Sequence, residues 1–418
     1  MQRPYCFDTN RLNGCQLLAG LALTATLASG QINLIGNGPD HNVNIFNTDR
    51  AVLEAGDVRK DLPCTVTPTK PSMGFDLKFH AGYEVTVPLR DIAGGENMLN
   101  IIFRVTPQNH PDQPVYFAQH VRVPSIDEDA KGDAYLQGAF DVGEGAYHVD
   151  WLMRDRAERV CSFYWDAEAA LGAKDKPISV SVPAGSVLQA DGEQFKEEPP
   201  VQRAADEPPL NIKLLVNFAP QNSLSAALQP LDTTALVSIL RTLMREPRIG
   251  KFSVIAFNMQ EQRVVYRQDG ADRIDFPALG EALHKLNLGT VDLKRLSEKH
   301  GDTEFLTDLV RREVATKPQS RPDAVIFAGP KVMLDANVSQ DALKEAGGDV
   351  NFPVFYMNYN LNPQAVPWKD AISHTVHFFH GSEYTITRPR DLWFAVTEMV
   401  SRIVKSRNAK QAAAISTK

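Results

Sequence analysis

Apolar and polar residues alternate along the first half of the chain, with the two-residue period of strands that bury one face. In the segment 147–153, for example, Tyr147, Val149, Trp151 and Met153 fall on one side of an extended backbone. The same pattern predicts further strands at 75–78, 83–88, 99–105, 115–123 and 160–165. Many short strands separated by turn-rich stretches predict an all-β sandwich over residues 62–182.

After residue 209 the pattern changes to apolar runs that alternate with helical periods. Residues 212–218 are apolar except for Lys213 and Asn217, as in a strand that is buried on both faces of a parallel sheet. Asp232 is a predicted N-cap, and Leu236, Ile239, Leu240 and Leu243 follow at helical spacing. Further strands are predicted at 252–257, 263–266, 324–328, 354–357 and 375–379, and further helices at 277–286, 306–314 and 392–403. This alternation predicts a doubly wound, Rossmann-like α/β domain over residues 210–405.

The remaining segments are predicted to connect or flank these two domains. Residues 183–209 are rich in Glu, Asp, Gln, Ala and Pro, a composition typical of a linker. Residues 31–61 are rich in Asn, Asp and Gly and predict an irregular segment with at most a short strand. Residues 406–418 are basic and rich in small side chains, which predicts a flexible tail.

The N-terminus has the three parts of a secretory signal. Arg3 and Arg11 precede an apolar run at 17–28, and small residues follow at Ala28 and Gly30. We therefore expect a signal peptide over residues 1–30, cleavage before Gln31, and export to the periplasm or the extracellular space. The alternative is a buried N-terminal helix. The run is too short to span a bilayer and no other run is long enough, so no membrane span is expected after signal removal.

Net charge and cysteine content indicate which classes of function and which compartment fit this chain. The formal net charge is -7 and the pI is about 5.8, without the clustered Lys and Arg that nucleic-acid binding needs. Removal of the signal would leave Cys64 and Cys161, and an even pair in an oxidising compartment predicts a disulfide. The alternative is a pair of buried free thiols.

Two motifs carry resemblances to known families. The tripeptide at 145–147, which enters a long strand at Tyr147, resembles the tyrosine corner of immunoglobulin-like sandwiches. Residues 217–221, 301–303 and 327–330 lie where von Willebrand factor A domains carry their metal-binding loops. The region 210–405 resembles such a domain, and the whole chain is similar to exported bacterial proteins of this type that are abundant in Acidobacteria.

The resemblance implies a degenerate metal-ion-dependent adhesion site. The family holds a divalent cation with a DxSxS loop, a later Thr and an Asp after the fourth strand, whereas this chain has Asn217, Ala219 and Gln221 in the first loop and Gly329 in the last. Only Thr303 matches a ligand. Hard cations need acidic oxygen ligands, so we expect neither a tightly bound divalent cation nor any other cofactor. The loops 217–224, 299–304 and 329–334 are the expected binding surface, because open α/β sheets bind ligands at the carboxyl ends of their strands.

Two further groups of polar residues could carry chemistry, but each also has a structural interpretation. The histidines at 374, 377 and 380 suggest a metal site, but a strand would point His377 away from the other two. Carboxylates and guanidinium groups interleave around the predicted 147–165 hairpin, and a solvated turn with modest ion pairs is favoured there over acid/base chemistry. The residues are Asp150, Arg154, Asp155, Arg156, Arg159 and Asp166.

No P-loop, HExxH motif or nucleophile elbow occurs in the sequence. The leading hypothesis is an exported binding protein that docks another protein or a component of the cell envelope through its A-type domain. The alternative is an extracytoplasmic hydrolase with a site between the two domains.

Overall fold

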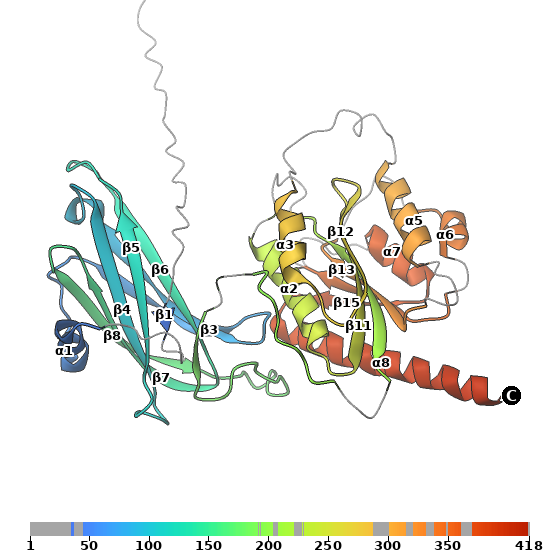
Figure 1. The fold of residues 1–418 in the computed structure, drawn as a ribbon, viewed down its shortest axis with the longest axis horizontal. Helices are drawn as coiled ribbons and strands as arrows, with labels where there is room; N and C mark the ends of the chain where they lie inside the picture. The colour runs from blue at the N-terminus through green and yellow to red at the C-terminus, as the bar shows by residue number, and fades with distance from the viewer. Residues whose placement is uncertain are drawn as a thin grey trace, which may run out of the picture.

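The computed structural model describes residues 35–36, 45–190, 192, 194–203, 208–220, 228, 230–286, 301–314, 321–331, 338–347, 350–360 and 370–416. An all-β body is followed along the chain by an α/β body, and Figure 1 shows the two side by side. The predicted signal segment 1–30 and Gln221 lie outside the described residues. No helix in the described part of the chain is both long and apolar enough to cross a membrane.

The all-β body is a sandwich of two antiparallel sheets, in agreement with the sequence pattern. Their strand orders are β1-β5-β4-β7-β8 and β2-β3-β6-β9. The first sheet comprises β1 (Ile35–Gly36), β4 (Asn97–Pro107), β5 (Val115–Val123), β7 (Gly145–Arg154) and β8 (Val160–Ala169). The second comprises β2 (Thr65–Met73), β3 (Phe79–Pro88), β6 (Asp133–Val142) and β9 (Val187–Gln189), and a short 3-10 helix, η1 (Leu89–Asp91), follows β3.

Aromatic side chains from both sheets fill the sandwich core. Trp151 is fully buried, and its ring lies 5.4 Å from that of Tyr83 in an edge-on arrangement. Tyr83 meets Phe103 in the same way, and Phe103 stacks on Phe117. Edge-on and offset contacts of this kind stabilise a core beyond the area that they bury. The alternation of apolar residues in the sequence therefore corresponds to one shared core.

Two predicted links are present in this body. Cys64 and Cys161 form a disulfide with Cα atoms 6.3 Å apart, which ties the start of β2 to β8. The Tyr147 hydroxyl donates a hydrogen bond of 2.8 Å to the carbonyl of Gly143, four residues upstream, as a tyrosine corner does. Both links fix the ends of long strands.

The segments that flank the sandwich are more ordered than their composition predicted. The 31–61 segment, expected to be irregular, contains the helix α1 (Asn47–Ala55), which packs Leu53 against Leu152. An ion pair between Arg154 and the buried Asp49 holds this helix on the sheet. Part of the predicted linker 183–209 forms β9, which pairs with β6. Tertiary contacts override a turn-like composition in both cases.

The α/β body contains a six-stranded sheet of order β12-β11-β10-β13-β14-β15. Its strands are β10 (Leu210–Asn217), β11 (Ile249–Asn258), β12 (Arg263–Ala271), β13 (Ala324–Gly329), β14 (Val354–Tyr359) and β15 (Ser382–Ile386). All neighbours are parallel except β11 and β12. Counted from β10, the order is 3-2-1-4-5-6, that of a doubly wound sheet, with the third strand reversed.

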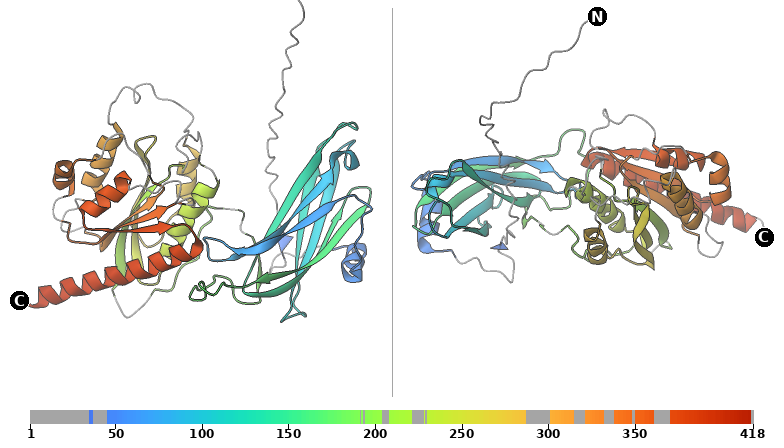
Figure 2. Two further views of the ribbon diagram at one scale, coloured as in Figure 1. Left: turned by 180° about the vertical axis from the view of Figure 1, so that it is seen from behind. Right: turned by 90° about the horizontal axis from the view of Figure 1, so that it is seen from above.

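Helices cover both faces of this sheet (Figures 1 and 2). One face packs on α2 (Pro230–Met244), α3 (Phe276–His284) and α8 (Pro389–Ser416). The other packs on α5 (Gly301–Glu313), α6 (Gln340–Gly347) and α7 (Ala371–Phe378). The central strands are therefore apolar on both sides, which explains the nearly continuous apolar run at 210–216.

Two predictions about the C-terminal part were wrong. Residues 375–379, predicted as a strand, belong mainly to α7, whose N-cap Asp370 accepts a hydrogen bond from Ser373 N. The strand there is β15, which starts seven residues later than predicted. The predicted tail at 406–418 is helical to Ser416, because α8 continues through an alanine-rich segment with high helix propensity.

The β2–β3 hairpin connects the two bodies. Phe75 at its tip packs edge-on against Tyr359 of β14, with ring centroids 6.0 Å apart. Asp175, in the loop after β8, lies 3.6 Å from Arg390 of α8. In Figure 2, left, the hairpin reaches the beginning of α8. The sandwich therefore contacts the α/β body near the carboxyl end of β14.

Candidate functional site

The topology of the α/β sheet marks one edge as the place for a ligand. Chain connections leave β10 and β13 in opposite directions, so the strand order reverses between these two neighbours. At such a switch point, the loops after the two strands separate and leave a crevice beyond the carboxyl ends. Asn217 is the last residue of β10 and Gly329 the last of β13. We call this edge the crest; the resemblance predicted binding there.

Amide side chains end the strands at the crest. Asn217, Asn258 and Asn358 are fully buried at or near the ends of β10, β11 and β14. Asn217 Oδ1 accepts a hydrogen bond of 3.2 Å from Met259 N, and Asn258 Nδ2 donates one of 2.6 Å to the Phe218 carbonyl. These bonds fix the first loop to the end of β11, and they use neutral groups throughout.

Two amide atoms at the crest have no hydrogen-bond partner in the described part of the chain. They are Asn217 Nδ2 and Asn358 Oδ1. The other half of each amide is anchored, Asn217 by Met259 N and Asn358 by a bond of 3.0 Å to Glu383 Oε1. A buried unpaired polar group costs about 1–3 kcal/mol, so the crest retains unused hydrogen-bonding capacity.

Gly329 leaves no space for a side chain at the last of the predicted metal positions. Its φ is +151°, and a Cβ built on it would lie 2.8 Å from Asn217 Cβ and 2.9 Å from the Asn217 carbonyl oxygen. Positive φ and these contacts both exclude an L side chain. The backbone conformation at residue 329 therefore excludes a carboxylate, so a substitution at this position alone would not restore the metal ligand.

The structure places the other predicted positions as follows. Ala219 is buried directly after β10. Thr303 lies in the first turn of α5, where its N–H donates to Asp302 Oδ1 at 2.7 Å. Gly301, which begins α5, lies against the side chain of Gln262 in the β11–β12 turn, so this helix starts at the crest. Without the two carboxylates and two serine hydroxyls of the family, the matched positions offer Mg²⁺ little to offset its dehydration.

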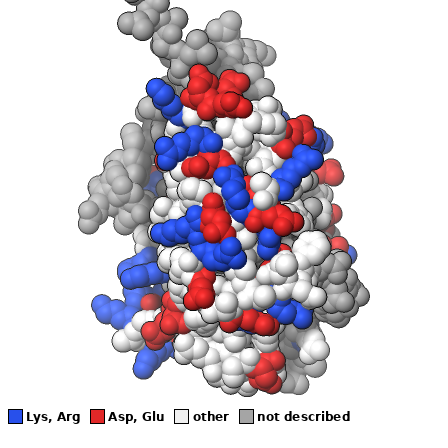
Figure 3. Space-filling model, turned by 90° about the vertical axis from the view of Figure 1, so that its left-hand side faces the viewer, with Lys and Arg blue, Asp and Glu red and all other residues white. Residues whose placement is uncertain are grey.

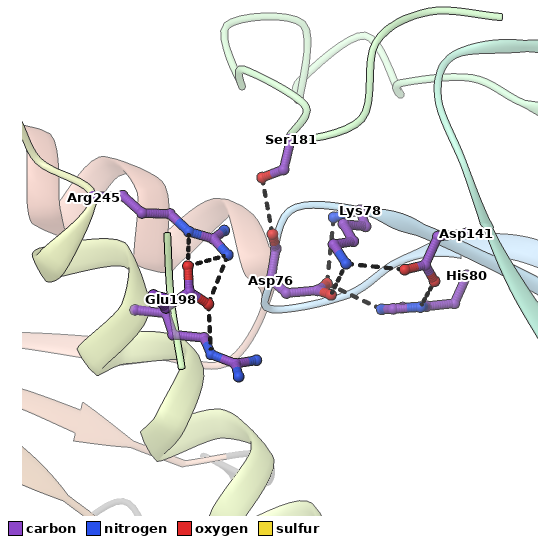
Figure 4. Close-up of polar contacts among 8 residues, drawn as sticks. Asp76, Lys78, His80, Asp141, Ser181, Glu198 and Arg245 are labelled. Atoms are coloured by element: carbon purple, nitrogen blue, oxygen red, sulfur yellow. Dashed lines mark hydrogen bonds and ion pairs between the residues drawn. The ribbon is translucent and has the colours of Figure 1, made fainter. Parts of the chain in front are cut away.

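A second polar cluster lies at the tip of the β2–β3 hairpin (Figure 4). His80 Nδ1 is 2.7 Å from Asp141 Oδ1, and its Nε2 is 3.0 Å from Asp76 Oδ1. Lys78 Nζ is 3.0 Å from Asp141 Oδ2 and 4.0 Å from Asp76 Oδ2. The Asp141 carboxylate is fully buried. We call these four residues the hairpin cluster.

The charges of the hairpin cluster balance one another. Hydrogen bonds to Asp141 and Asp76 raise the pKa of His80 to about 10, although burial opposes the charge. Burial also opposes ionisation of Asp76, but the hydrogen bond and charge of His80 lower the pKa of that carboxyl below its usual value. At neutral pH an imidazolium and an ammonium thus face two carboxylates. A general base needs a pKa near the working pH, so His80 is not suited to that role.

Within the described residues, Asp76, His80 and Asp141 are the group whose ligand atoms come close enough to hold a metal ion. Both ring nitrogens of His80, however, already face carboxylates, and the ammonium group of Lys78 lies near the same two carboxylates. Gly74 also packs against His80, since a Cβ there would lie 2.3 Å from Nε2. This geometry favours an ion-pair network that stiffens the hairpin over a metal centre.

Opposite the hairpin, a carboxylate is clamped by Arg241 of α2 and by Arg245, which directly follows this helix. Glu198 is buried and receives two hydrogen bonds from Arg245, of 3.0 and 3.1 Å. Arg241 Nε lies 2.9 Å from Glu198 Oε1, and its guanidinium also covers the ring of Phe276. A cleft of about 450 Å³ separates this clamp from Lys78. Figure 4 shows the two groups on its opposite walls.

The histidine-rich segment does not form a metal site in the described structure. His374 and His377 lie on α7, and His380 follows it with φ +54°. His377 Nε2 is 3.9 Å from Glu383 Oε2. The predicted orientation was wrong because the segment is helical, so the argument from strand geometry does not apply to these histidines.

The acidic residues of the 147–165 hairpin are less solvated than predicted. Asp150 pairs with Arg104 at 2.8 Å and Asp155 with Arg159 at 2.7 Å, and both carboxylates are buried. Asp166 alone of the three is exposed, and it accepts from His148. Cross-strand pairing explains the difference, because β4 supplies the arginine opposite Asp150. Acidic and basic groups alternate over this end of the molecule (Figure 3).

The hairpin cluster and the Glu198 clamp were not predicted from the sequence. Asp76, Lys78 and His80 alternate at a strand period, which is a visible signal, but their partner Asp141 is 61 residues from His80. Glu198 lies in a segment whose composition is that of a linker, and nothing local indicates that it is buried. Both clusters depend on contacts between segments that are distant in sequence.

Comparisons with known proteins give no family. No protein-family model and no curated protein matches the sequence. Solved structures with partial similarity include a variant of the minor pilin PilB from Streptococcus sanguinis, at 8% identity and a TM-score of 0.29, over 72% of this chain and 87% of that one. Another is β-glucuronidase 2 from Bacteroides uniformis, at 9% identity and a TM-score of 0.18, over 73% of this chain and 39% of that one. A structural-genomics target, SoR45, has 10% identity and a TM-score of 0.17, over 28% of this chain and 95% of that one.

Proposed function

We propose that this chain is an exported binding protein whose C-terminal body, similar to a von Willebrand factor A domain, docks a protein or an envelope component without a bound metal. The observation that carries the proposal is the crest, where Asn217 and Gly329 flank the switch point of a 3-2-1-4-5-6 sheet. The fold offers a ligand position there, and its strand ends present neutral amides. Carboxylates lie beside them at Asp302, Asp370 and Glu383.

The chemistry of the crest supports direct docking over metal-bridged docking. A bridging cation would need carboxylate oxygens as ligands, whereas the strand ends supply amides that donate and accept hydrogen bonds. The nearby carboxylates of Asp370 and Glu383 already accept hydrogen bonds on both of their oxygens. Gly329 blocks an acidic residue through its backbone conformation. A partner would then be recognised by hydrogen bonding and shape, and its binding would be insensitive to chelators.

Two further observations support export. The N-terminal segment has the charge, apolar run and small residues of a signal peptide. The Cys64–Cys161 disulfide is a bond of oxidising compartments. Periplasmic or extracellular localisation is part of the same proposal.

The hydrolase alternative receives less support from the cleft that faces α2. Its buried carboxylate, Glu198, is neutralised by two guanidinium groups, and the nearby His80 is protonated between two carboxylates. Neither arrangement supplies a base or a nucleophile. The binding proposal therefore stays ahead of the enzymatic one.

Site-specific photocrosslinking tests the proposal in the native host or its closest culturable equivalent. A photoreactive phenylalanine analogue replaces Gln260, which is exposed at the β11–β12 turn beside the crest. The matched control places it at Glu398, on the exposed side of α8. We expect a discrete adduct from position 260, unchanged by EDTA, and none from position 398.

Three outcomes would count against this function. One is the absence of any adduct specific to the crest, and another is an adduct that EDTA abolishes. The third is calorimetric binding of Mg²⁺ or Mn²⁺ at micromolar concentration that disappears in Thr303→Ala, since this would restore the metal-dependent mode.

A further inference from the structure

The cleft between the β2–β3 hairpin and α2 is rich in positive charge. We call it the hairpin–helix cleft. It is lined by Lys78, Ser181, Lys196, Glu197, Glu198, Pro199, Arg241 and Arg245. Four of these side chains are basic and two are acidic, in a protein whose net charge is -7. The local sign is thus opposite to that of the whole molecule.

The acidic groups do not cancel this excess. Glu197 is drawn to Arg273, 2.6 Å away. Glu198 is shared between Arg241 and Arg245, so two guanidinium groups face one carboxylate. Among the described residues, and without Lys196, the five positive groups of Lys78, His80, Arg241, Arg245 and Arg273 face the four carboxylates of Asp76, Asp141, Glu197 and Glu198. A concave surface with excess charge concentrates counter-ions of the opposite sign.

We propose that the hairpin–helix cleft binds a phosphate or sulfate group. Lys78 approaches from the hairpin and Arg245 approaches from the opposite wall (Figure 4). A tetrahedral oxyanion presents oxygens in several directions and can reach both walls, whereas a carboxylate presents only one edge. Guanidinium and ammonium donors form short, charge-assisted hydrogen bonds with such oxygens.

The lining also limits what the anion is attached to. Pro199 is the one apolar residue among the described residues that line the cleft, and this lining includes no aromatic side chain that could stack on a base. The volume of about 450 Å³ is in the range of small-molecule sites. The ligand class that fits is therefore a hydrophilic phosphorylated or sulfated compound, such as a sugar phosphate, or the same group on an envelope polymer.

Anion binding here would join the sandwich to the α/β body. Lys78 and Ser181 belong to the sandwich, whereas Arg241 lies on α2 and Arg245 directly follows this helix. Ser181 Oγ already donates to the Asp76 carbonyl, which holds the sandwich wall in place. An oxyanion that contacts both walls would add a bridge next to the Phe75 contact, so it would stabilise the full chain.

Calorimetry and thermal unfolding of the full chain test the site. Inorganic phosphate, sulfate and glucose 6-phosphate are each titrated into the protein. Glucose and sodium chloride, at equal ionic strength, serve as the controls. We expect phosphate and glucose 6-phosphate to bind and to raise the unfolding temperature, while glucose and chloride do neither. Tighter binding of glucose 6-phosphate than of phosphate would indicate a small phosphorylated ligand. Equal binding of the two would indicate recognition of the oxyanion alone, as on a polymer.

Charge-matched variants locate the binding. Arg245→Gln is expected to weaken phosphate binding at least about tenfold, since it removes a charge-assisted donor. Lys196→Gln, at an exposed residue, repeats the test where folding is not at risk. Arg122→Gln makes the same charge change on the far side of the sandwich and should leave binding unchanged. Equal effects of phosphate and chloride, or unaltered binding in both cleft variants, would overturn the proposal.

Discussion

Single residues at the crest explain why we expect no metal-binding site at this edge of the sheet. Asn217 differs from an aspartate by one heavy atom, so a single substitution would restore a carboxylate at this position. Gly329 is different, because its backbone conformation and its contact with Asn217 exclude any side chain. Ala219 removes a further oxygen in a buried position. A metal site would therefore require a new backbone path as well as new side chains.

Gly329→Ala is predicted to destabilise the α/β body by about 2–4 kcal/mol, because the new Cβ is both at positive φ and within 3 Å of Asn217. Gly95→Ala is the matched control: Gly95 has an ordinary φ, and nothing lies within 4 Å of its added Cβ. Urea unfolding of both variants measures the difference. Similar free energies of unfolding for the two would show that the crest backbone is less constrained than described.

At the scale of elements, the β2–β3 hairpin predicts a dependence of stability on pH. The pKa of His80 is raised from 6.5 to about 10 in the folded state, so the folded protein holds this proton more tightly than the unfolded chain. The stabilisation is complete below pH 6.5 and is lost as the pH rises toward 10. Wild-type protein should therefore lose thermal stability between pH 7 and 9 beyond what is seen in His80→Gln.

His110→Gln, at an exposed turn, is the control for this experiment and should follow the wild-type pH profile. A companion variant, Asp141→Asn, is expected to cost about 1–3 kcal/mol at pH 7, because two charged donors lose their shared acceptor. Parallel pH profiles for wild type and His80→Gln would mean that the hairpin cluster does not hold the proton.

Elements with a clear hydrophobic period were predictable from the sequence, and those defined by tertiary contacts were not. The strands of the sandwich core follow from strict alternation, as in β7, and the central strands of the sheet from apolar runs. The segment around Thr375 misled because β-branched residues favour strands, while the cap at Asp370 and the packing of Ile372 determine a helix.

The candidate sites likewise differ in whether the sequence could predict them. The position of the crest, at the end of β10, followed from the fold class, because ligands of open sheets meet the carboxyl ends of strands. Asn217, Ala219 and Gly329 were named in advance as the degenerate metal positions that the resemblance implies. The burial of Glu198 and the pairing of His80 with Asp141 were not, since they join segments between 47 and 61 residues apart. Local patterns carry no information on such pairs.

At the scale of the whole molecule, an aromatic contact and an ion pair between described residues link the sandwich to the α/β body. Phe75 meets Tyr359, which directly follows the crest residue Asn358, and Asp175 pairs with Arg390. The hairpin cluster lies immediately behind Phe75 and holds the turn in which Leu77 adopts φ +60°. A rigid hairpin thus places one aromatic ring beside the binding edge. Orientation of the two bodies and access to the crest are consequently linked through this ring.

Phe75→Ala should loosen that link with little effect on either core. Phe75 is partly buried against the α/β core, so its loss is expected to cost about 1–3 kcal/mol, below the range for a fully buried phenylalanine. The main expected result is a wider distribution of distances between dye pairs placed on the sandwich and on α8, measured by single-molecule energy transfer. Phe46→Ala, which alters an exposed ring on the far side of the sandwich, should leave the distribution unchanged. An identical distribution in Phe75→Ala would mean that the remaining contacts, including Asp175 with Arg390, suffice to hold the two bodies, and that the crest is independent of the hairpin.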